Sequence, residues 1–171
     1  DARRRLGPGG VDPIGALPAE ARMFVSSLNG QPPRDRLIAI ESWVREKGHY
    51  DLENGKMAGV KDELPPAELF KVMTARIEEV RRNHPELQAA LQGKMFSGVC
   101  ADFAKLTAGM LRESGIVAGV AEGFRSNGTD PVITTAQFHA VAIAQWPAAN
   151  GQTRLIPVDG TPGGIDQSQQ E

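Results

Sequence analysis

The segment FSGVCADFAKLTAGMLRESGI, residues 96–116, places the single cysteine of the chain at the expected start of a helix. Apolar residues recur in it at steps of four, three and four, the spacing of one helical face: Val99, Phe103, Leu106 and Met110. We expect Ser97–Gly98 to cap this helix and Gly115 to end it. Cys100 then lies in the first turn, where unpaired N–H groups and the helix dipole stabilise a thiolate.

The composition is that of an ordinary globular domain. Of the 171 residues, 40% are hydrophobic and 23% are charged. This length predicts a flexible tail over 1–16, one domain over 17–164 and a polar tail over 165–171. The net charge of −2 gives no electrostatic reason to expect nucleic acid as a partner. No apolar run is long enough for a membrane span, so we expect a soluble segment that does not insert into a membrane.

The ends of the sequence and its cysteine count bear on its context. The chain begins at Asp1 rather than Met and ends in the polar stretch IDQSQQE, so we expect it to be part of a larger chain. One cysteine cannot form an internal disulfide, so cysteine usage does not indicate the redox compartment. Both an extracytoplasmic location and attachment to a larger protein stay open.

Helices are expected in the first part of the domain and strands in the last. Helical spacing predicts helices over 17–28, 34–47 and 67–83, a shorter helical stretch toward Gln92, and the helix that contains Cys100. We expect a loop from His49 to Pro66. Residues rich in Val, Ala and Ile predict strands over 116–124, 137–146 and 152–158. This order indicates an α+β fold, a helical N-terminal half packed on an antiparallel sheet.

Two residues downstream complement the cysteine. His139 lies in QFHAVAIAQW, residues 137–146, and Asp159 lies in RLIPVDGTPGG, residues 154–164. A cysteine with a histidine and an aspartate elsewhere in the chain is the pattern of a thiol nucleophile, its base and an orienting acid. A lone histidine in an apolar strand is more often a hydrogen-bonded core residue. The accompanying aspartate and the helix-start cysteine favour the functional interpretation.

The last predicted hairpin tests whether His139 and Asp159 meet. A loop over 147–151 centres on Ala149, and symmetric pairing then opposes residues whose numbers sum to 298. This register places His139 opposite Asp159, and opposed residues have Cβ atoms about 4.5–5.5 Å apart on one face. We therefore expect the carboxylate to hydrogen-bond the imidazole. Pro157, in the second strand, requires a bulge or an edge position.

These residue types predict acyl-transfer chemistry. A Cys100 thiolate would attack an amide carbonyl and form a thioester through a tetrahedral oxyanion. His139 would move the protons, and Asp159 would fix the histidine tautomer and stabilise the imidazolium. The backbone N–H of Cys100 is the expected first oxyanion donor. The side chain of Gln92 is a candidate second donor, although a surface position is the commoner one for glutamine.

Other chemistry finds less support in the sequence. His49 and His84 lack a third ligand at metal-binding spacing, so we expect no metal. The glycine-rich segments lack the strand–loop–helix context of a phosphate-binding loop, so we expect no cofactor. Asp102 is best interpreted as a first-turn carboxylate that the helix dipole favours, rather than as a catalytic acid.

Together these residues resemble the transglutaminase-like superfamily of cysteine enzymes, a circularly permuted relative of the papain fold. The resemblance covers roughly residues 17–164 and is carried by GVCADFAKLTAGMLRESGI, FHAVAI and VDGTPGG, with LPAEARMFVSSLNG and SWVREKGHYD as the helical lead-in. It implies Cys100 as nucleophile, His139 as base and Asp159 as orienting acid. Members often have an aromatic residue after the histidine and a tryptophan before the aspartate, where this chain has Ala140–Val141 and Arg154–Leu155. The chain is short for the extra β-domains of the calcium-dependent animal enzymes, so we expect no calcium requirement.

The resemblance leaves the acyl acceptor open. We expect a cysteine-dependent amide-bond acyltransferase or hydrolase that acts on protein or peptide substrates through a thioester. One alternative is a peptidase or deamidase that uses water as acceptor. Another is a catalytically silent interaction domain that keeps the fold. A papain-like peptidase in the strict sense is disfavoured, because its nucleophile is expected nearer the N-terminus.

Overall fold

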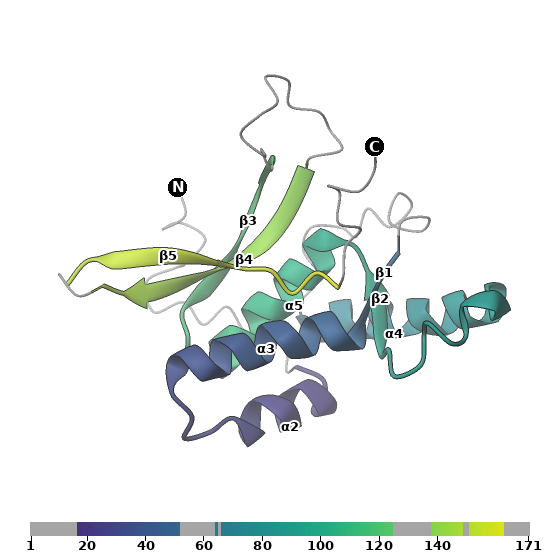
Figure 1. Cartoon of the computed structure of the whole chain (residues 1–171), viewed down its shortest axis with the longest axis horizontal. Helices are drawn as coiled ribbons and strands as arrows, with labels where there is room; N and C mark the ends of the chain where they lie inside the picture. Colours follow the sequence, from purple (N-terminus) through teal and green to yellow (C-terminus); the bar gives the residue numbers. More distant parts are fainter. Residues whose placement is uncertain (1–16, 52–63, 65, 125–137, 149–150, 163–171) are drawn as a thin grey trace.

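The computed structural model describes residues 17–51, 64, 66–124, 138–148 and 151–162 (Figure 1). The two expected tails and most of the loop expected from His49 to Pro66 lie outside these residues. The described part confirms an α+β fold, in which helices precede an antiparallel sheet along the chain.

Four α-helices lie in the described part of the chain: α2 (Ala19–Ser27), α3 (Pro33–Lys47), α4 (Pro66–Asn83) and α5 (Cys100–Glu113). Each lies within a few residues of its predicted range. Gly115, with a φ of +86°, follows the end of α5 in the left-handed conformation that glycine favours. The stretch toward Gln92 forms only a short 3₁₀ helix, η2 (Pro85–Leu87), followed by turns. None of the described helices is long and apolar enough to cross a membrane.

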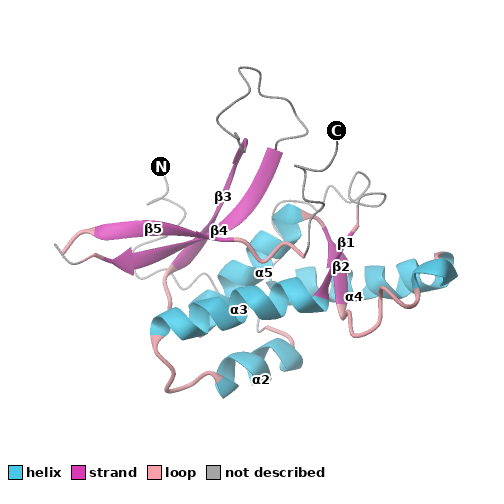
Figure 2. Cartoon of the chain, in the orientation of Figure 1, coloured by secondary structure: helices cyan, strands magenta, loops and turns pink. Residues whose placement is uncertain are grey.

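The antiparallel sheet has the order β3 (Ala118–Phe124), β4 (Phe138–Pro147) and β5 (Thr153–Val158). It packs on α5, which crosses one face of it (Figure 2). That face of β4 carries three fully buried alanines, Ala140, Ala142 and Ala144. Because these side chains are small, the helix backbone can approach the sheet closely. This contact brings the start of α5 beside the first residues of β4.

The structure also contains a two-stranded parallel sheet that was not predicted from the sequence. These are β1 (Gly48–Tyr50) and β2 (Phe96–Gly98), paired with Tyr50 opposite Gly98. The prediction of a loop from His49 onward is therefore wrong for His49 and Tyr50. Each strand has three residues, which is too short for alternation of apolar and polar residues to be recognised.

The predicted register of the last hairpin is wrong by two residues. Paired residues of β4 and β5 sum to 300 rather than 298, as in Ala142 with Val158. The reason is the loop, because Ala148 N–H donates to Gln152 O at 2.8 Å and Gly151 has a φ of +76°. Ala148 and Gln152 thus extend the pairing beyond the ends of the two strands, and the three residues left between them end in Gly151, in the left-handed position typical of such loops.

The corrected register keeps His139 and Asp159 on one face. A shift of two residues preserves the alternation of side chains, whereas a shift of one would reverse it. Asp159 directly follows the end of β5 and is not opposed to His139. Pro157 pairs with Ile143 on β5, an edge strand of the described sheet, as its missing N–H requires.

Aromatic residues connect the helices to β1. Ring contacts run from Phe24 through Trp43, Phe96 and Phe103 to Tyr50, with centroids 5.2, 5.8, 6.0 and 6.3 Å apart in that order. Phe96 and Phe103 are fully buried, so this chain of rings lies in the main core. The core thus fixes the position of the Tyr50 ring relative to α5.

Candidate active site

Cys100 is the first residue of α5, as the sequence predicts. It is 8% exposed and packs with Ala104 and Ala140, with Tyr50 and Val120 beside them. The thiol therefore lies where the N-terminus of a helix meets a strand of the sheet. The sulfur therefore lies at the end of α5 that carries the unpaired N–H groups and the positive end of the helix dipole.

The start of α5 is held by Asp102 rather than by the predicted cap. Val99 is the N-cap residue, and Ser97–Gly98 belong to β2. The backbone N–H of Val99 donates to Asp102 Oδ2 at 3.1 Å, and Arg76 donates to the same oxygen at 3.0 Å. Asp102 is 1% exposed. It is thus the first-turn carboxylate that the sequence analysis expects, and it also pairs with α4.

His139 and Asp159 meet as predicted, although not by the predicted pairing. His139 Nε2 lies 2.8 Å from Asp159 Oδ2. The second carboxylate oxygen, Oδ1, accepts the Thr161 N–H at 3.0 Å. Burial acts to raise the pKa of Asp159, but the hydrogen bonds from Thr161 and His139 outweigh it and hold the pKa below its usual value. Asp159 is therefore an anion at neutral pH. Because it bonds Nε2 of His139, the other ring nitrogen, Nδ1, can bond another group.

Cys100 contacts the strand that carries His139, at the residue that follows the histidine. Ala140 contacts Cys100, and His139 precedes it on β4. The contacts of the described residues include no hydrogen bond between the Cys100 thiol and His139. In unliganded enzymes such bonds are often long and tighten only when substrate is bound. The described contacts thus join His139 to Asp159, and they bring Cys100 to the strand position next to His139.

Tyr50 also lies in the region around Cys100, and the sequence analysis did not select it. Its ring packs beside Cys100, and its hydroxyl faces both the thiol and the backbone N–H of that residue. Burial raises the pKa of Tyr50, the Cys100 thiol raises it further, and the Cys100 N–H acts in the opposite direction. The phenol therefore keeps its proton at neutral pH and can donate a hydrogen bond. Tyr50 could be selected only from the pairing of β1 with β2. This pairing places Tyr50 opposite Gly98, two residues before Cys100.

Gln92 does not join the site in this structure. It lies exposed in the turns after η2, and no described contact joins its side chain to Cys100. His49 Nδ1 lies 3.1 Å from Ser97 Oγ, and burial lowers the pKa of His49. His84 pairs with Glu86 at 3.0 Å. Among the described residues, no group of three or more His, Cys, Asp or Glu side chains could hold a metal ion.

A sequence model of the transglutaminase-like superfamily matches residues 22–150, more than half of the chain. The chain belongs to the transglutaminase-like superfamily. The matched range contains Cys100 and His139 and ends before Asp159.

Two further comparisons concern individual proteins. The chain is similar to a crystal structure from Cytophaga hutchinsonii named as a "Putative Cysteine Protease", with 20% sequence identity and a TM-score of 0.46. That similarity covers 83% of this chain and 37% of the other one, so this transglutaminase-like domain spans well under half of that protein. No curated protein matches the sequence.

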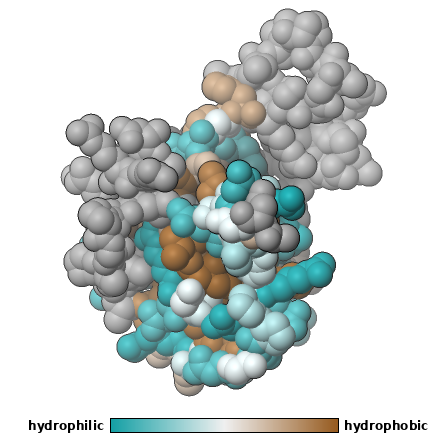
Figure 3. Space-filling model, turned by 90° about the vertical axis from the view of Figure 1, so that its left-hand side faces the viewer, coloured by the Kyte–Doolittle hydropathy of each residue, from teal (hydrophilic) through white to brown (hydrophobic). Residues whose placement is uncertain are grey.

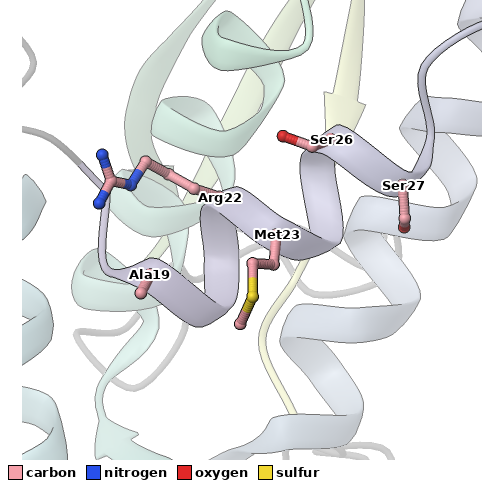
Figure 4. Close-up of a pocket in the computed structure, with 5 residues that line it drawn as sticks. All are labelled: Ala19, Arg22, Met23, Ser26 and Ser27. Atoms are coloured by element: carbon pink, nitrogen blue, oxygen red, sulfur yellow. The ribbon is translucent and has the colours of Figure 1, made fainter.

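The surface of the transglutaminase-like domain has two further features. A hollow on α2 is lined by residues of that helix alone, Ala19, Arg22, Met23, Ser26 and Ser27 (Figure 4). Apolar surface is also visible among hydrophilic residues in Figure 3. The large apolar side chains exposed in the described part are Met23, Ile38, Val117, Phe124, Phe138 and Leu155. The hollow shares no residue with the region around Cys100.

The lowered pKa of Asp159 predicts how acid affects the stability of this domain. Because the folded-state pKa lies below the unfolded value of 3.8, the anion stabilises the fold above pH 3.8. This contribution is lost as the pH falls through the lower, folded-state pKa. We therefore expect Asp159→Asn to be less stable than wild type at neutral pH, with the difference shrinking below pH 3.8. Urea unfolding of both proteins at several pH values measures this, and a difference independent of pH would contradict it.

Proposed function

We propose that this transglutaminase-like domain is a cysteine-dependent acyltransferase or hydrolase. It acts on amide bonds of protein or peptide substrates through a thioester on Cys100. The observation that carries the proposal is the 2.8 Å hydrogen bond between His139 and Asp159, on a strand whose next residue, Ala140, contacts a cysteine at a helix N-terminus. An imidazole oriented by a carboxylate is the base that a thiol nucleophile requires.

The first half of the proposed reaction forms the thioester. His139 accepts the thiol proton at Nδ1, since Nε2 is bonded to Asp159. The Cys100 sulfur then forms a bond to the substrate carbonyl carbon, and the carbonyl π electrons move to oxygen. When the oxyanion collapses, the C–N bond breaks, and His139 delivers its proton to the leaving nitrogen.

The second half releases the acyl group. Water or an amine attacks the thioester carbonyl, and His139 accepts the proton of the attacking group. The C–S bond breaks as the tetrahedral intermediate collapses, which regenerates the thiolate of Cys100. The products are a carboxylic acid when water attacks and a new amide when an amine attacks.

Both tetrahedral intermediates need hydrogen-bond donors for the oxyanion. We assign this role to the backbone N–H of Cys100 and the hydroxyl of Tyr50, which already lie against each other. The phenol is protonated at neutral pH because burial and the thiol raise its pKa. Tyr50 takes the place that the sequence analysis considered for Gln92.

Alkylation of the thiol across pH tests this proposal. All label reports Cys100, because the chain has no other cysteine. We expect wild type to react with iodoacetamide at a rate that stays high between about pH 5 and pH 7, as a thiolate–imidazolium pair does. His139→Ala is expected to react like an ordinary thiol with a pKa of about 8.5. His84→Ala, which removes a histidine paired with Glu86, is the matched control.

The outcomes separate an enzyme from a silent domain. Ordinary thiol behaviour in wild type as well as in His139→Ala would contradict the proposal and favour an interaction domain. If the profile is as expected, analysis of the products of a glutamine- and lysine-containing peptide identifies the acyl acceptor. Released ammonia without cross-links indicates water, and isopeptide bonds indicate an amine.

A further inference from the structure

Both backbone polar groups of Asp159 are bonded to side chains of α3. The Asp159 N–H donates to Glu41 Oε1 at 3.1 Å, and Arg45 donates to the Asp159 carbonyl oxygen at 2.5 Å. Glu41 and Arg45 lie one turn apart on α3 and form an ion pair at 3.3 Å. We call these two side chains the α3 clamp.

The clamp acts where the sheet no longer holds the chain. The β4–β5 ladder ends at Val158, so no strand of the described part of the chain pairs with the N–H and C=O groups of Asp159. The next residue, Gly160, is buried between two helices. A Cβ there would lie 2.3 Å from Thr107 Oγ1 of α5 and 3.0 Å from Val44 Cγ1 of α3. The chain thus runs directly along α3 as it leaves β5.

We propose that Glu41 and Arg45 are positioning residues that hold the Asp159 carboxylate against Nε2 of His139. The role of this contact in catalysis rests on the proposed function. The helix that carries the clamp continues directly into β1, which carries Tyr50, and packs against α5, which begins at Cys100. One helix therefore sets the orienting acid relative to the nucleophile and to the hydroxyl beside it.

The exposure of the pair distinguishes positioning from a general role in stability. The side chains of Arg45 and Glu41 are 48% and 28% exposed, and exposed ion pairs contribute little to folding. Removing Glu41 therefore leaves the fold intact while it frees the Asp159 N–H. The carboxylate keeps only its own contacts with Thr161 and His139, and its position relative to the imidazole becomes less fixed.

The test compares Glu41→Ala with Glu41→Gln in the full chain. Glutamine keeps an oxygen that can accept the Asp159 N–H, whereas alanine removes it. We expect Glu41→Ala to lower the alkylation rate of Cys100 near pH 6 by about tenfold, the effect of one hydrogen bond to a charged group, and Glu41→Gln to stay within about threefold of wild type. Glu78→Ala, which breaks the exposed Glu78–Arg81 ion pair on α4, should leave the rate unchanged.

Two further measurements show whether Glu41 acts through Asp159. In an Asp159→Ala background, Glu41→Ala should add no further loss, and an additional tenfold loss there would overturn the proposal. The ¹⁵N–¹H correlations of the His139 imidazole should show a hydrogen-bonded proton on Nε2, the nitrogen that faces Asp159, in wild type and in Glu41→Gln. In Glu41→Ala the signal of the Nε2 proton should change. An unchanged signal would also overturn the proposal.

The imidazole signal keeps this test independent of catalysis. If Cys100 reacts as an ordinary thiol in wild type, the proposed function fails, and the His139 signal still reports whether the clamp orients the carboxylate. If wild type shows the expected thiolate profile but Glu41→Ala changes neither profile nor signal, the clamp fails alone. Thermal unfolding of each variant confirms that it is folded before it is compared.

Discussion

Replacing Asp102 with alanine is expected to lower the free energy of unfolding by about 3–5 kcal/mol, the cost of leaving a buried charge without its partner. The Asp102 side chain is 2% exposed, and the Arg76 side chain that pairs with it at 3.0 Å is 11% exposed. The substitution would leave this guanidinium unpaired. It would also free the N–H of Val99, which donates to the same carboxylate oxygen.

Three comparison variants separate these two costs. Asp102→Asn keeps an oxygen for the Val99 N–H but loses the charge, so its loss should be smaller than that of Asp102→Ala. In Asp102→Ala with Arg76→Met, no unpaired charge is left, and part of the stability should return. Glu78→Ala breaks an exposed ion pair of α4 and should change stability by less than about 1 kcal/mol.

Urea unfolding, followed by circular dichroism, measures the four variants on one scale. A loss for Asp102→Ala no larger than that for Glu78→Ala would mean that this ion pair does not hold α4 to the start of α5. The expected large loss has a further consequence for the thiol. Asp102 fixes the backbone of Val99, the residue before Cys100. Loosening this first turn would therefore misalign the N–H groups and the helix dipole that act on the Cys100 sulfur.

The long elements of this fold could be predicted because their patterns repeat. The apolar face of α5 is one example, since Phe103, Leu106 and Met110 are all fully buried as their spacing indicates. Val99 carries the same pattern but lies outside the helix, half-buried at the N-cap position. A periodic pattern identifies the face of a helix more reliably than its first residue, because the cap depends on local hydrogen bonds.

The predicted register of the last hairpin is wrong, yet the contact that it predicts between His139 and Asp159 is present. His139 and Asp159 do bond, but Asp159 follows the strand instead of pairing within it. The sequence contained the correcting signal in Asn150–Gly151, since a glycine that ends a three-residue loop adopts the left-handed conformation. Counting the loop from this glycine gives the observed register. The shared face survived because the error was an even number of residues.

Tyr50 and the α3 clamp could not be predicted, because they depend on contacts between distant segments. Glu41 and Asp159 are 118 residues apart in the sequence, and neither lies in a pattern that points to the other. Tyr50 reaches Cys100 only through a pair of three-residue strands. Such contacts follow from the packed arrangement of α3, β1 and α5, which no local sequence pattern describes.

Tyr50→Phe is expected to slow acyl transfer by about 100- to 1,000-fold, the usual cost of losing one oxyanion donor. Phenylalanine keeps the ring contact with Phe103 at 6.3 Å and the packing beside Cys100, and it removes only the hydroxyl. The fold should therefore be retained. Because the hydroxyl donates most strongly to the negative charge of the transition state, the loss should appear in kcat, with KM little changed.

Thr74→Val is the matched control for the loss of a buried hydroxyl. Thr74 lies on α4, and its buried Oγ1 has no hydrogen-bond partner among the described residues. Deleting that hydroxyl should leave kcat unchanged. Steady-state kinetics with one peptide substrate compares the two variants with wild type, and thermal unfolding confirms that both are folded.

The pH dependence distinguishes a neutral donor from an anionic group. Burial and the Cys100 thiol raise the pKa of Tyr50 above its ordinary value of 10.0, so the wild-type rate should show no loss from its ionisation near neutral pH. A kcat for Tyr50→Phe equal to that of wild type would remove the tyrosine from the mechanism. The backbone N–H of Cys100 would then remain as the proposed donor, because the side chain of Gln92 is exposed and no described contact joins it to Cys100. A loss in kcat without a change in KM would instead make the hydroxyl a partner of the transition state rather than of the bound substrate.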